Sequence, residues 1–354
     1  MQTRRQLMKA GALGTGLLAA PAFLKKAWAQ QPLVVRIPGG YGDVWDVHYF
    51  QPFTKATGIP VTGTFSTDIP YSEFKISVET GSYRYDAAAA ITKELITRLK
   101  SDNLVDKLDL DSPDISARPA ASYNENWLTH SLYCFAMVYR TTTFPQGVSS
   151  FKDMWNVKGF PGTRALRKRA VDTIEMATRG IGVPRDKVYE FLSTPDGWDK
   201  VFAGLDEIRP HITNWWDSDA TLEQMIGQGE LDISPVTSHR AQRLINEGAE
   251  IAIDFNEAYY STMGYAIPRG TPKLAQAREF IKFAAAPERE AALVKSSPMG
   301  PIHPKAFDYL APDFAKLLPT YPENFAKMNE QDPVFWQKND KYATTRFQEW
   351  LLKA

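Results

Sequence analysis

Several polar residues of this chain lie next to short apolar segments, and their types suit the binding of a small molecule. They are Gly40 and Tyr41 after residues 33–37, Thr92 after residues 85–91, Thr237 and Ser238 after residues 231–233, and Tyr260 and Ser261 just before Met263. At the carboxyl ends of parallel strands, loops and helix N-termini offer free N–H groups that bind polar solutes and anions. The pattern therefore predicts a ligand-binding site.

The residue types needed for catalysis, a metal or a cofactor form no recognisable motif. The chain has one cysteine, Cys134, and five histidines without an i,i+4 pair or an H-E-x-x-H sequence, so neither a disulfide nor a zinc site is expected. The sequence also has no dinucleotide-binding, nucleophile-elbow or haem-attachment motif. We expect no catalytic residue, no metal and no cofactor, and keep an exported enzyme as an alternative from a different class.

The apolar segments and the stretches between them predict alternating strands and helices. Residues 33–37 favour a strand, residues 44–57 have apolar side chains at helical spacing, and residues 59–65 favour a second strand. Such a βαβ unit implies a parallel sheet with a right-handed crossover. Further strands are expected at 85–91, 136–139 and 231–234, and further helices at 186–193, 220–227 and 274–284. The expected fold class is α/β.

The first 29 residues have the composition of a cleavable export signal. They contain five basic residues and no acid, an apolar stretch over 10–24, and Ala27-Trp28-Ala29, an A-x-A cleavage site. Residues 3–9 resemble the twin-arginine export motif, with an ordinary secretory signal as the alternative. A membrane span needs about 20 apolar residues, so this stretch is too short for an anchor. We expect a mature periplasmic chain from Gln30 onwards, without membrane insertion.

The charge balance argues against nucleic acid as a partner. The whole chain has 41 Lys and Arg and 41 Asp and Glu, and without the five basic residues of the signal the balance is 36 to 41. Nucleic-acid binding calls for clustered basic residues and a high pI. The length favours two lobes, at roughly 100–200 residues per domain.

A series of short motifs follows in order along the mature chain. They are F-T-K-A-T-G-I-P-V at 53–61, Y-D at 85–86, S-S-F-K-D-M-W at 149–155, Q-G-E-L-D-I at 228–233, G-Y-A-I-P at 264–268 and the helix at 275–285. In this order and spacing they resemble the extracellular solute-binding proteins of ATP-driven importers, of the spermidine- and putrescine-binding type. The resemblance covers nearly the whole mature chain.

The resemblance implies a two-lobed periplasmic-binding-protein fold of type II, with crossover strands near 135–140 and 263–268 and the ligand in the cleft between the lobes. Lobe one would comprise 30–134 plus 264–310, lobe two would comprise 138–261, and C-terminal helices at 311–354 would pack on the lobes. A small-molecule solute that bridges the lobes favours the closed state, which is presented to an ABC permease in the inner membrane. We expect a monomer; a solute sensor would use the same fold.

Departures from the resemblance suggest which solute is bound. Polyamine-binding members hold ammonium groups with carboxylates, but this chain has Arg169 and Met263 at two such positions and keeps a carboxylate at Asp172. A buried ammonium beside a guanidinium is strongly disfavoured at low dielectric. We therefore expect a small organic anion or zwitterion, such as an amino acid, ω-amino acid, aminophosphonate or carboxylate, held by Arg169. Polyamine binding is the alternative, as is a surface role for Arg169.

Aromatic and acidic residues complete the predicted site. Trp215 and Tyr260 could form walls or face a cation, and Asp43, Glu94 or Asp172 could bind an amine. Tyr259 and Tyr260 resemble the tyrosine pair of iron carriers, but that pair should follow the motif at 228–233, where this chain has His239 and Arg240. Ferric binding is therefore not expected.

Overall fold

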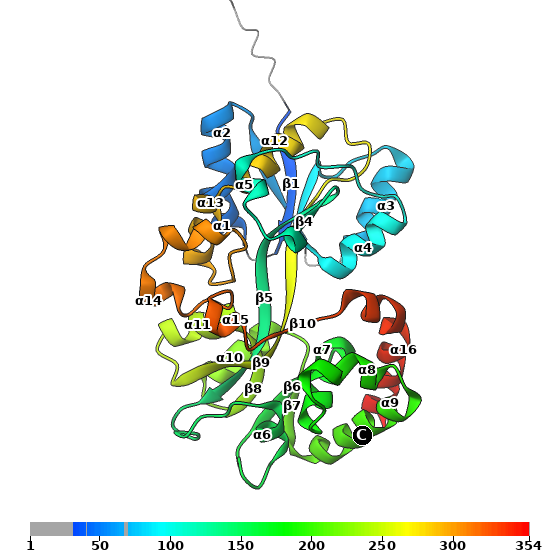
Figure 1. The fold of residues 1–354 in the computed structure, drawn as a ribbon, viewed down its shortest axis with the longest axis vertical. Coiled ribbons are helices and arrows are strands. Elements are labelled where there is room, and N and C mark those ends of the chain that lie inside the picture. Colours follow the sequence, from blue (N-terminus) through cyan, green and yellow to red (C-terminus); the bar gives the residue numbers. More distant parts are fainter. Residues whose placement is uncertain (1–30, 40, 67–69, 354) are drawn as a thin grey trace, which may run out of the picture. The chain divides into compact units, whose positions relative to one another are not determined.

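A computed structural model describes residues 31–39, 41–66 and 70–353. Its longest strands are β5 (Trp127–Arg140) and β9 (Ile251–Ala266), which pair antiparallel along most of their length. They lie in the middle of a mixed sheet with the order β2-β1-β3-β9-β5-β8-β6-β7. Figure 1 shows β5 and β9 running between an upper and a lower group of helices. These two strands are therefore common to both groups.

We use the name lobe one for β1 (Leu33–Pro38), β2 (Val61–Ser66), β3 (Ala87–Thr92) and the helices around them. β1 pairs parallel with β2 and β3, and β3 pairs antiparallel with β9. The helical segments of lobe one are α1 (Gly42–Trp45), η1 (Asp46–Phe50), α2 (Gln51–Thr57), α3 (Tyr71–Thr80), α4 (Lys93–Ser101), α5 (Pro113–Ser116), η2 (Ala120–Ser122), α12 (Leu274–Ala284) and α13 (Pro287–Ser296). The short strand β4 (Tyr123–Asn124) pairs with the start of β5.

We use the name lobe two for β6 (Arg164–Arg167), β7 (Ile212–Trp216), β8 (Ile233–Thr237) and their helices. β8 pairs antiparallel with β5, and β6 pairs parallel with β7 and β8. The helical segments of lobe two are α6 (Phe151–Trp155), α7 (Ala170–Gly180), η3 (Arg185–Lys187), α8 (Val188–Leu192), α9 (Pro195–Ile208), η4 (Arg209–His211), α10 (Asp219–Gly227) and α11 (Ser238–Asn246).

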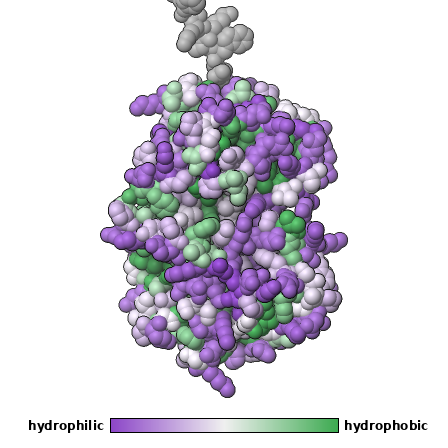
Figure 2. Space-filling view, in the orientation of Figure 1, coloured by the Kyte–Doolittle hydropathy of each residue, from purple (hydrophilic) through white to green (hydrophobic). Residues whose placement is uncertain are grey.

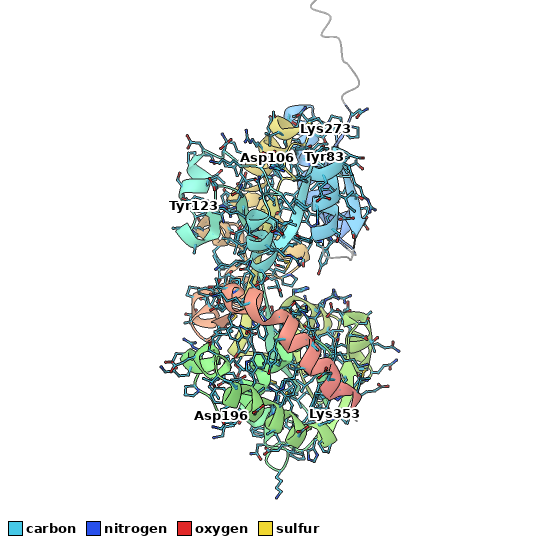
Figure 3. The ribbon with its side chains drawn as sticks, turned by 90° about the vertical axis from the view of Figure 1, so that its right-hand side faces the viewer. Tyr83, Asp106, Tyr123, Asp196, Lys273 and Lys353 are labelled. Carbon is cyan, nitrogen blue, oxygen red and sulfur yellow. The ribbon has the colours of Figure 1, made fainter. Side chains whose placement is uncertain are left out.

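After β9 the chain passes through lobe one and then reaches lobe two again. The segments η5 (Pro304–Tyr309), α14 (Pro312–Ala315) and α15 (Pro322–Phe325) follow α13. Then β10 (Asn329–Glu330) pairs with β9, and α16 (Pro333–Leu352) packs on α7 while also contacting α4 of lobe one. Figure 3 shows α16 crossing the face of lobe two, with Lys353 at its end. We call residues 327–332, which include β10, the strap.

Local sequence explains where several of these elements begin and end. The side chains of Thr92, Ser150, Thr194 and Asp332 accept hydrogen bonds from backbone N–H groups in the first turns of α4, α6, α9 and α16, as N-cap residues do. α2 ends at Gly58, whose φ of 77° is in the left-handed region that glycine adopts without strain. Thr92 thereby joins the end of β3 directly to the start of α4.

Each lobe has its own apolar core. One core surrounds β1 and α12 in lobe one, and another surrounds β6, β8 and the lower part of β5 in lobe two. A third core joins α16 to α7 and α9 through Trp336, Phe347 and Trp350. On the face seen in Figure 2, hydrophilic side chains surround small hydrophobic patches. None of the helices in the described ranges is apolar over a length that could cross a membrane.

The predicted α/β class and the two crossover strands are confirmed. The helix over 274–284 has the expected bounds, whereas the helix over 44–57 contains a π-helical turn, η1. The strand expected at 136–139 is part of the much longer β5. The first half of β5 has no clear alternation of apolar and polar residues, because both faces of this strand are covered. The full length of β5 is therefore apparent only from its pairing with β9.

Candidate functional site

The carboxyl ends of strands from both lobes meet the middle of β5 and β9. Tyr133 pairs with Ser261, and Phe135 pairs with Tyr259 on one side and Thr237 on the other. Residues directly opposite each other in a sheet project their side chains from the same face. One face of the crossover strands therefore carries these five residues, and the ends of β3, β6 and β8 lie around it.

Two arginines at the end of β6 share one buried carboxylate. Arg167 is the last residue of β6, and its guanidinium lies 5.1 Å from the ring centre of Phe135 and 5.2 Å from that of Trp216. Its Nη1 is 2.8 Å from Oδ2 of Asp172, and Nη1 of Arg169 is 3.5 Å from the same oxygen. Asp172 has no exposed surface, whereas the Arg169 side chain is 50% exposed. Arg169 is thus fixed at one end and accessible to a solute.

Opposite charge from lobe one faces these arginines. Glu94, in the first turn of α4, accepts a hydrogen bond of 3.3 Å from the hydroxyl of Ser261. The pKa of Arg169 is raised by Asp172 and also by Tyr133 and Glu94. Burial raises the pKa of Tyr133 to about 12, and the Glu94 carboxylate contributes to the increase. The site therefore combines the side chains of Arg167 and Arg169, those of Asp172 and Glu94, and the phenol of Tyr133, which is neutral at neutral pH.

The end of β8 and the start of α11 form a second polar group, which touches lobe one. Oη of Tyr41 is 3.0 Å from Nε2 of His239, so a side chain of lobe one is hydrogen-bonded to lobe two. Burial lowers the pKa of His239 to about 3, with help from Arg240, so that its imidazole is neutral. Oγ1 of Thr237 is buried, and in the described part of the chain it has no hydrogen-bond partner. A solute could satisfy this hydroxyl.

The structure brings together some of the residues predicted from the sequence. Thr92 caps α4 beside Glu94, and Arg169, Asp172 and Ser261 lie around the same face of β5 and β9. Tyr41, Thr237 and Ser238 lie at the junction of α1 and α11, with Ser238 buried beside the thiol of Cys134. Gly40 lies outside the described residues.

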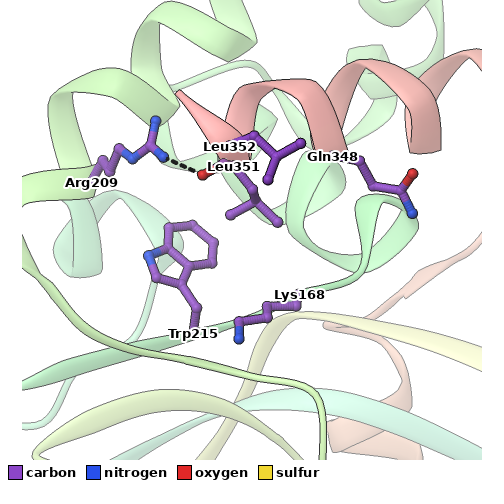
Figure 4. A pocket seen from close by; sticks show the side chains of 6 residues that line it. All are labelled: Lys168, Arg209, Trp215, Gln348, Leu351 and Leu352. Atoms are coloured by element: carbon purple, nitrogen blue, oxygen red, sulfur yellow. Dashed lines mark hydrogen bonds between the residues drawn. The ribbon is translucent and has the colours of Figure 1, made fainter. Parts of the chain in front are cut away.

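Two predicted wall residues lie elsewhere. Tyr260 pairs with Cys134 and packs against Phe325, so it projects from the opposite face of the crossover strands. Trp215 packs edge-on against Phe347 and Trp350 of α16. It lines a hollow of about 550 Å³ near the end of α16 (Figure 4). The other residues of this hollow are Lys168, Arg209, Gln348, Leu351 and Leu352, and neither Arg167 nor Glu94 is among them.

Sequence reasoning did not single out Arg167, Tyr133 or Gln331. Arg167 could have been found as the residue that ends a strand in the basic run 164–169, of which Arg164 is fully buried and donates to the carbonyls of Met154 and Gly162. Nε2 of Gln331 donates a hydrogen bond of 3.2 Å to Oδ1 of Asp172, although the two residues are 159 positions apart in the sequence. No local pattern indicates that contact.

The charged groups of this site suit the binding of an organic zwitterion better than the binding of a metal ion. In the described ranges, no group of three or more His, Cys, Asp or Glu side chains is arranged to hold a metal ion. A guanidinium pair can bind a carboxylate bidentately, and Glu94 can bind an amine. Tyr133 is close enough to both kinds of charge to be influenced by each, and Phe135 lies beside Arg167, so both offer aromatic surface.

Comparisons with known proteins show which family and fold this chain is similar to. Residues 48–326 match the family model of the bacterial extracellular solute-binding proteins. A gamma-aminobutyric acid-binding protein of Pseudomonas aeruginosa is 29% identical over 337 residues, which cover 94% of both chains.

Two solved structures are similar along almost their whole length. The PBP MotA from A. tumefaciens B6, solved in complex with glucopine, has a TM-score of 0.78 and 32% identity, covering 90% of this chain and 99% of that one. An ABC transporter substrate-binding protein from Bradyrhizobium japonicum has a TM-score of 0.81 and 30% identity, covering 90% and 98%. Both are substrate-binding proteins, and their two-lobed fold is the one that the sequence predicted for this chain.

Proposed function

Because the chain belongs to the bacterial extracellular solute-binding protein family, we propose that it captures a small zwitterion, an ω-amino acid or a related amino acid, for an ABC importer. The observation that carries the proposal is the opposition of Arg167 and Arg169 from lobe two to Glu94 from lobe one, across Tyr133. A solute with a carboxylate at one end and an ammonium at the other can bind both lobes at once.

Capture would work by closure of the lobes around the solute. A ligand shifts a conformational equilibrium only by its differential affinity for the two states. A zwitterion makes both of its ionic contacts only when the lobes are close together, so it favours the closed state. The permease would then recognise that state.

Relatives support the choice of solute class. The curated relative is named for gamma-aminobutyric acid, and the PBP MotA, which is 32% identical, was solved in complex with glucopine. A polyamine fits less well because it has no negative group for Arg167 and Arg169. Aminophosphonates and simple carboxylates fit the arginine pair, but simple carboxylates leave Glu94 without a partner.

We also propose the cellular setting that the sequence indicated. The signal would be cleaved after Ala29, with export by the twin-arginine route, and the mature chain would act as a periplasmic monomer. The lobe boundaries at 30–134 with 264–310, at 138–261 and at 311–354 belong to the same proposal. An unchanged precursor in a strain that lacks the twin-arginine pathway would support the route, and normal processing there would contradict it.

A binding screen tests the function directly. Thermal shift of the purified mature chain should reveal stabilisation by one or more ω-amino acids, since a ligand of the native state raises the melting temperature. Isothermal titration would then give the affinity. Stabilisation by spermidine or putrescine, without any by amino acids, would contradict the proposal.

The arginine pair gives a matched mutational test. We expect Arg169→Ala to weaken binding by more than about tenfold, because a charge-assisted contact with the carboxylate is lost. Lys168→Ala is the control, since Lys168 is the neighbouring residue but lines the separate hollow at the end of α16. Equal affinity of Arg169→Ala and wild type in the titration would remove Arg169 from the site.

A further inference from the structure

A buried carboxyl group lies behind the arginine pair, one turn further along α7. Glu175 has no exposed surface. Its Oε1 accepts hydrogen bonds of 2.6 Å from the hydroxyl of Tyr189 and of 2.6 Å from Nε1 of Trp336, and its Oε2 accepts one of 2.9 Å from Nε2 of Gln331. All three donors are uncharged, and no cation among residues 31–39, 41–66 and 70–353 is in direct contact with this carboxyl group.

Glu175 is connected to the arginines through a single amide of the strap. Nε2 of Gln331 donates both to Glu175 and to Oδ1 of Asp172, at 3.2 Å. The other oxygen of Asp172 holds Arg167 and Arg169. The hydrogen bonds therefore run from Glu175 to Gln331, to Asp172 and to the two guanidinium groups that would meet the solute.

Building on the proposed function, we propose that Glu175 is a proton-linked positioning residue of the solute site. With a proton on Glu175, Asp172 is the carboxylate in direct contact with Arg167 and Arg169, and this group of three charges keeps a net positive charge for the anionic group of the solute. Without that proton, a further buried negative charge lies behind them and weakens the attraction. A solute would never touch Glu175 itself.

The surroundings of Glu175 favour this behaviour. Burial raises its pKa to about 8, and the hydrogen bonds from Tyr189, Trp336 and Gln331 only partly offset the effect. Asp172 on the same helix raises the pKa further. From β9, the hydroxyl of Tyr259 donates to the backbone carbonyl of Glu175 and has a pKa far above its usual value, so it stays neutral.

A second ion pair near Glu175, between Arg179 and Glu257, contains one charge of each sign. Arg179, one turn after Glu175 in α7, is paired with Glu257 of β9. Tyr189 and Tyr259, which contact Glu175, both have pKa values raised far above the usual value, so they stay neutral near pH 8. The expected effect on binding can thus be assigned to this one carboxyl group.

The sign of the pH dependence follows from competition for the arginines. The bound anion and the ionised Glu175 repel each other, so affinity should be highest well below pH 8 and should decrease as pH rises through about 8. By thermodynamic linkage, solute binding at about pH 8 should take up a fraction of a proton.

Titration calorimetry of the mature protein tests the proposal, with γ-aminobutyric acid as the first probe from the screen. For wild type we expect the dissociation constant to increase by roughly threefold to tenfold between about pH 6.5 and about pH 9, a range typical of coupling between partly solvated charges. Binding heats in two buffers of different ionisation enthalpy should show proton uptake near pH 8. Glu175→Gln should remove both effects.

A second variant separates titration from a merely structural role. Tyr189→Phe removes a donor that stabilises the ionised form of Glu175, so the midpoint of the pH profile should move to higher pH. A purely structural contribution would change affinity equally at every pH and leave the midpoint in place. Val188 is the neighbouring residue, and Val188→Ala serves as a control for the stability of α8.

A measurement without solute keeps the two proposals distinct. Carbon-13 NMR of the side-chain carboxyl of Glu175 should show a titration midpoint near pH 8, and a midpoint near the usual 4.5 would overturn the inference. A wild type that binds its solute with no dependence on pH would also overturn it. If no solute of the panel binds at any pH, the proposed function fails instead, while the NMR midpoint still reports on Glu175.

Discussion

At the scale of single residues, the buried charges of this protein have distinct roles. Arg118 and Glu290 are both fully buried, and they are paired with each other and hydrogen-bonded to backbone groups in lobe one. This pair fixes the backbone around residues 285 and 302. Asp172 instead uses its burial to fix Arg169, whose outer half remains accessible. Burial of a charge therefore indicates a binding role only where its partner is exposed.

Glu94 allows a prediction about specificity. We expect Glu94→Gln to weaken the binding of an ω-amino acid by roughly tenfold or more, because the ammonium loses a charged partner. Binding of the corresponding carboxylic acid without the amine should change little. Calorimetry with both compounds measures the difference, and Glu79→Gln on the exposed face of α3 is the control. An equal loss for both compounds would show that Glu94 does not contact the amine.

At the scale of elements, α16 has the unusual position of contacting both lobes. It packs on α7 of lobe two, near Asp172 and Glu175, and also meets α4 of lobe one, whose first turn contains Glu94. Just before α16, Glu330 of the strap is paired with Lys93 at the start of α4. The C-terminal segment thus reaches the two helix starts that supply the opposite charges of the site.

The packing of α16 predicts a large difference between two of its aromatic residues. Phe347 is 1% exposed, and its ring packs against Trp215 and Trp350, so Phe347→Ala should destabilise the protein by about 3–5 kcal/mol through the lost burial and the cavity. Tyr342 is 49% exposed, and Tyr342→Ala should cost less than about 1 kcal/mol. Denaturant unfolding measures both; comparable losses would mean that α16 is not packed as described.

At the scale of the whole protein, buried histidines make stability depend on pH. Burial lowers the pKa of His130 to about 3, well below its usual 6.5. Its Nε2 accepts a hydrogen bond from the backbone N–H of Ala90, at 3.2 Å, which a protonated ring could not accept. The unfolded chain takes up this proton more readily than the native protein does.

The sign of the effect follows from linkage. Where the unfolded state binds more protons, stability falls as pH decreases. The free energy of unfolding should therefore be insensitive to His130 above about pH 7 and should fall between about pH 6.5 and pH 3. Denaturant unfolding at several pH values should show a shallower decline for His130→Asn than for wild type. Parallel curves for the two proteins would rule out this contribution.

The sequence by itself determined the class of the fold and much of its local structure. Apolar runs and apolar periodicity located β1, β2, β3 and α12. These signals act over a few residues, so they are readable without knowledge of the neighbours. Arg169 was predicted by a different route, because it departs from the pattern of the family that the sequence resembles.

Only the tertiary structure decided which charged groups meet. Glu94, Arg167 and Gln331 come from segments far apart in sequence, and their proximity depends on the pairing of β5 with β9 and on the course of the strap. Trp215 was expected beside the solute, but the structure places it under α16, whose aromatic face needed a partner. Local sequence sets what each segment can form, whereas long-range burial selects which segments pack together, and the site exists only where they do.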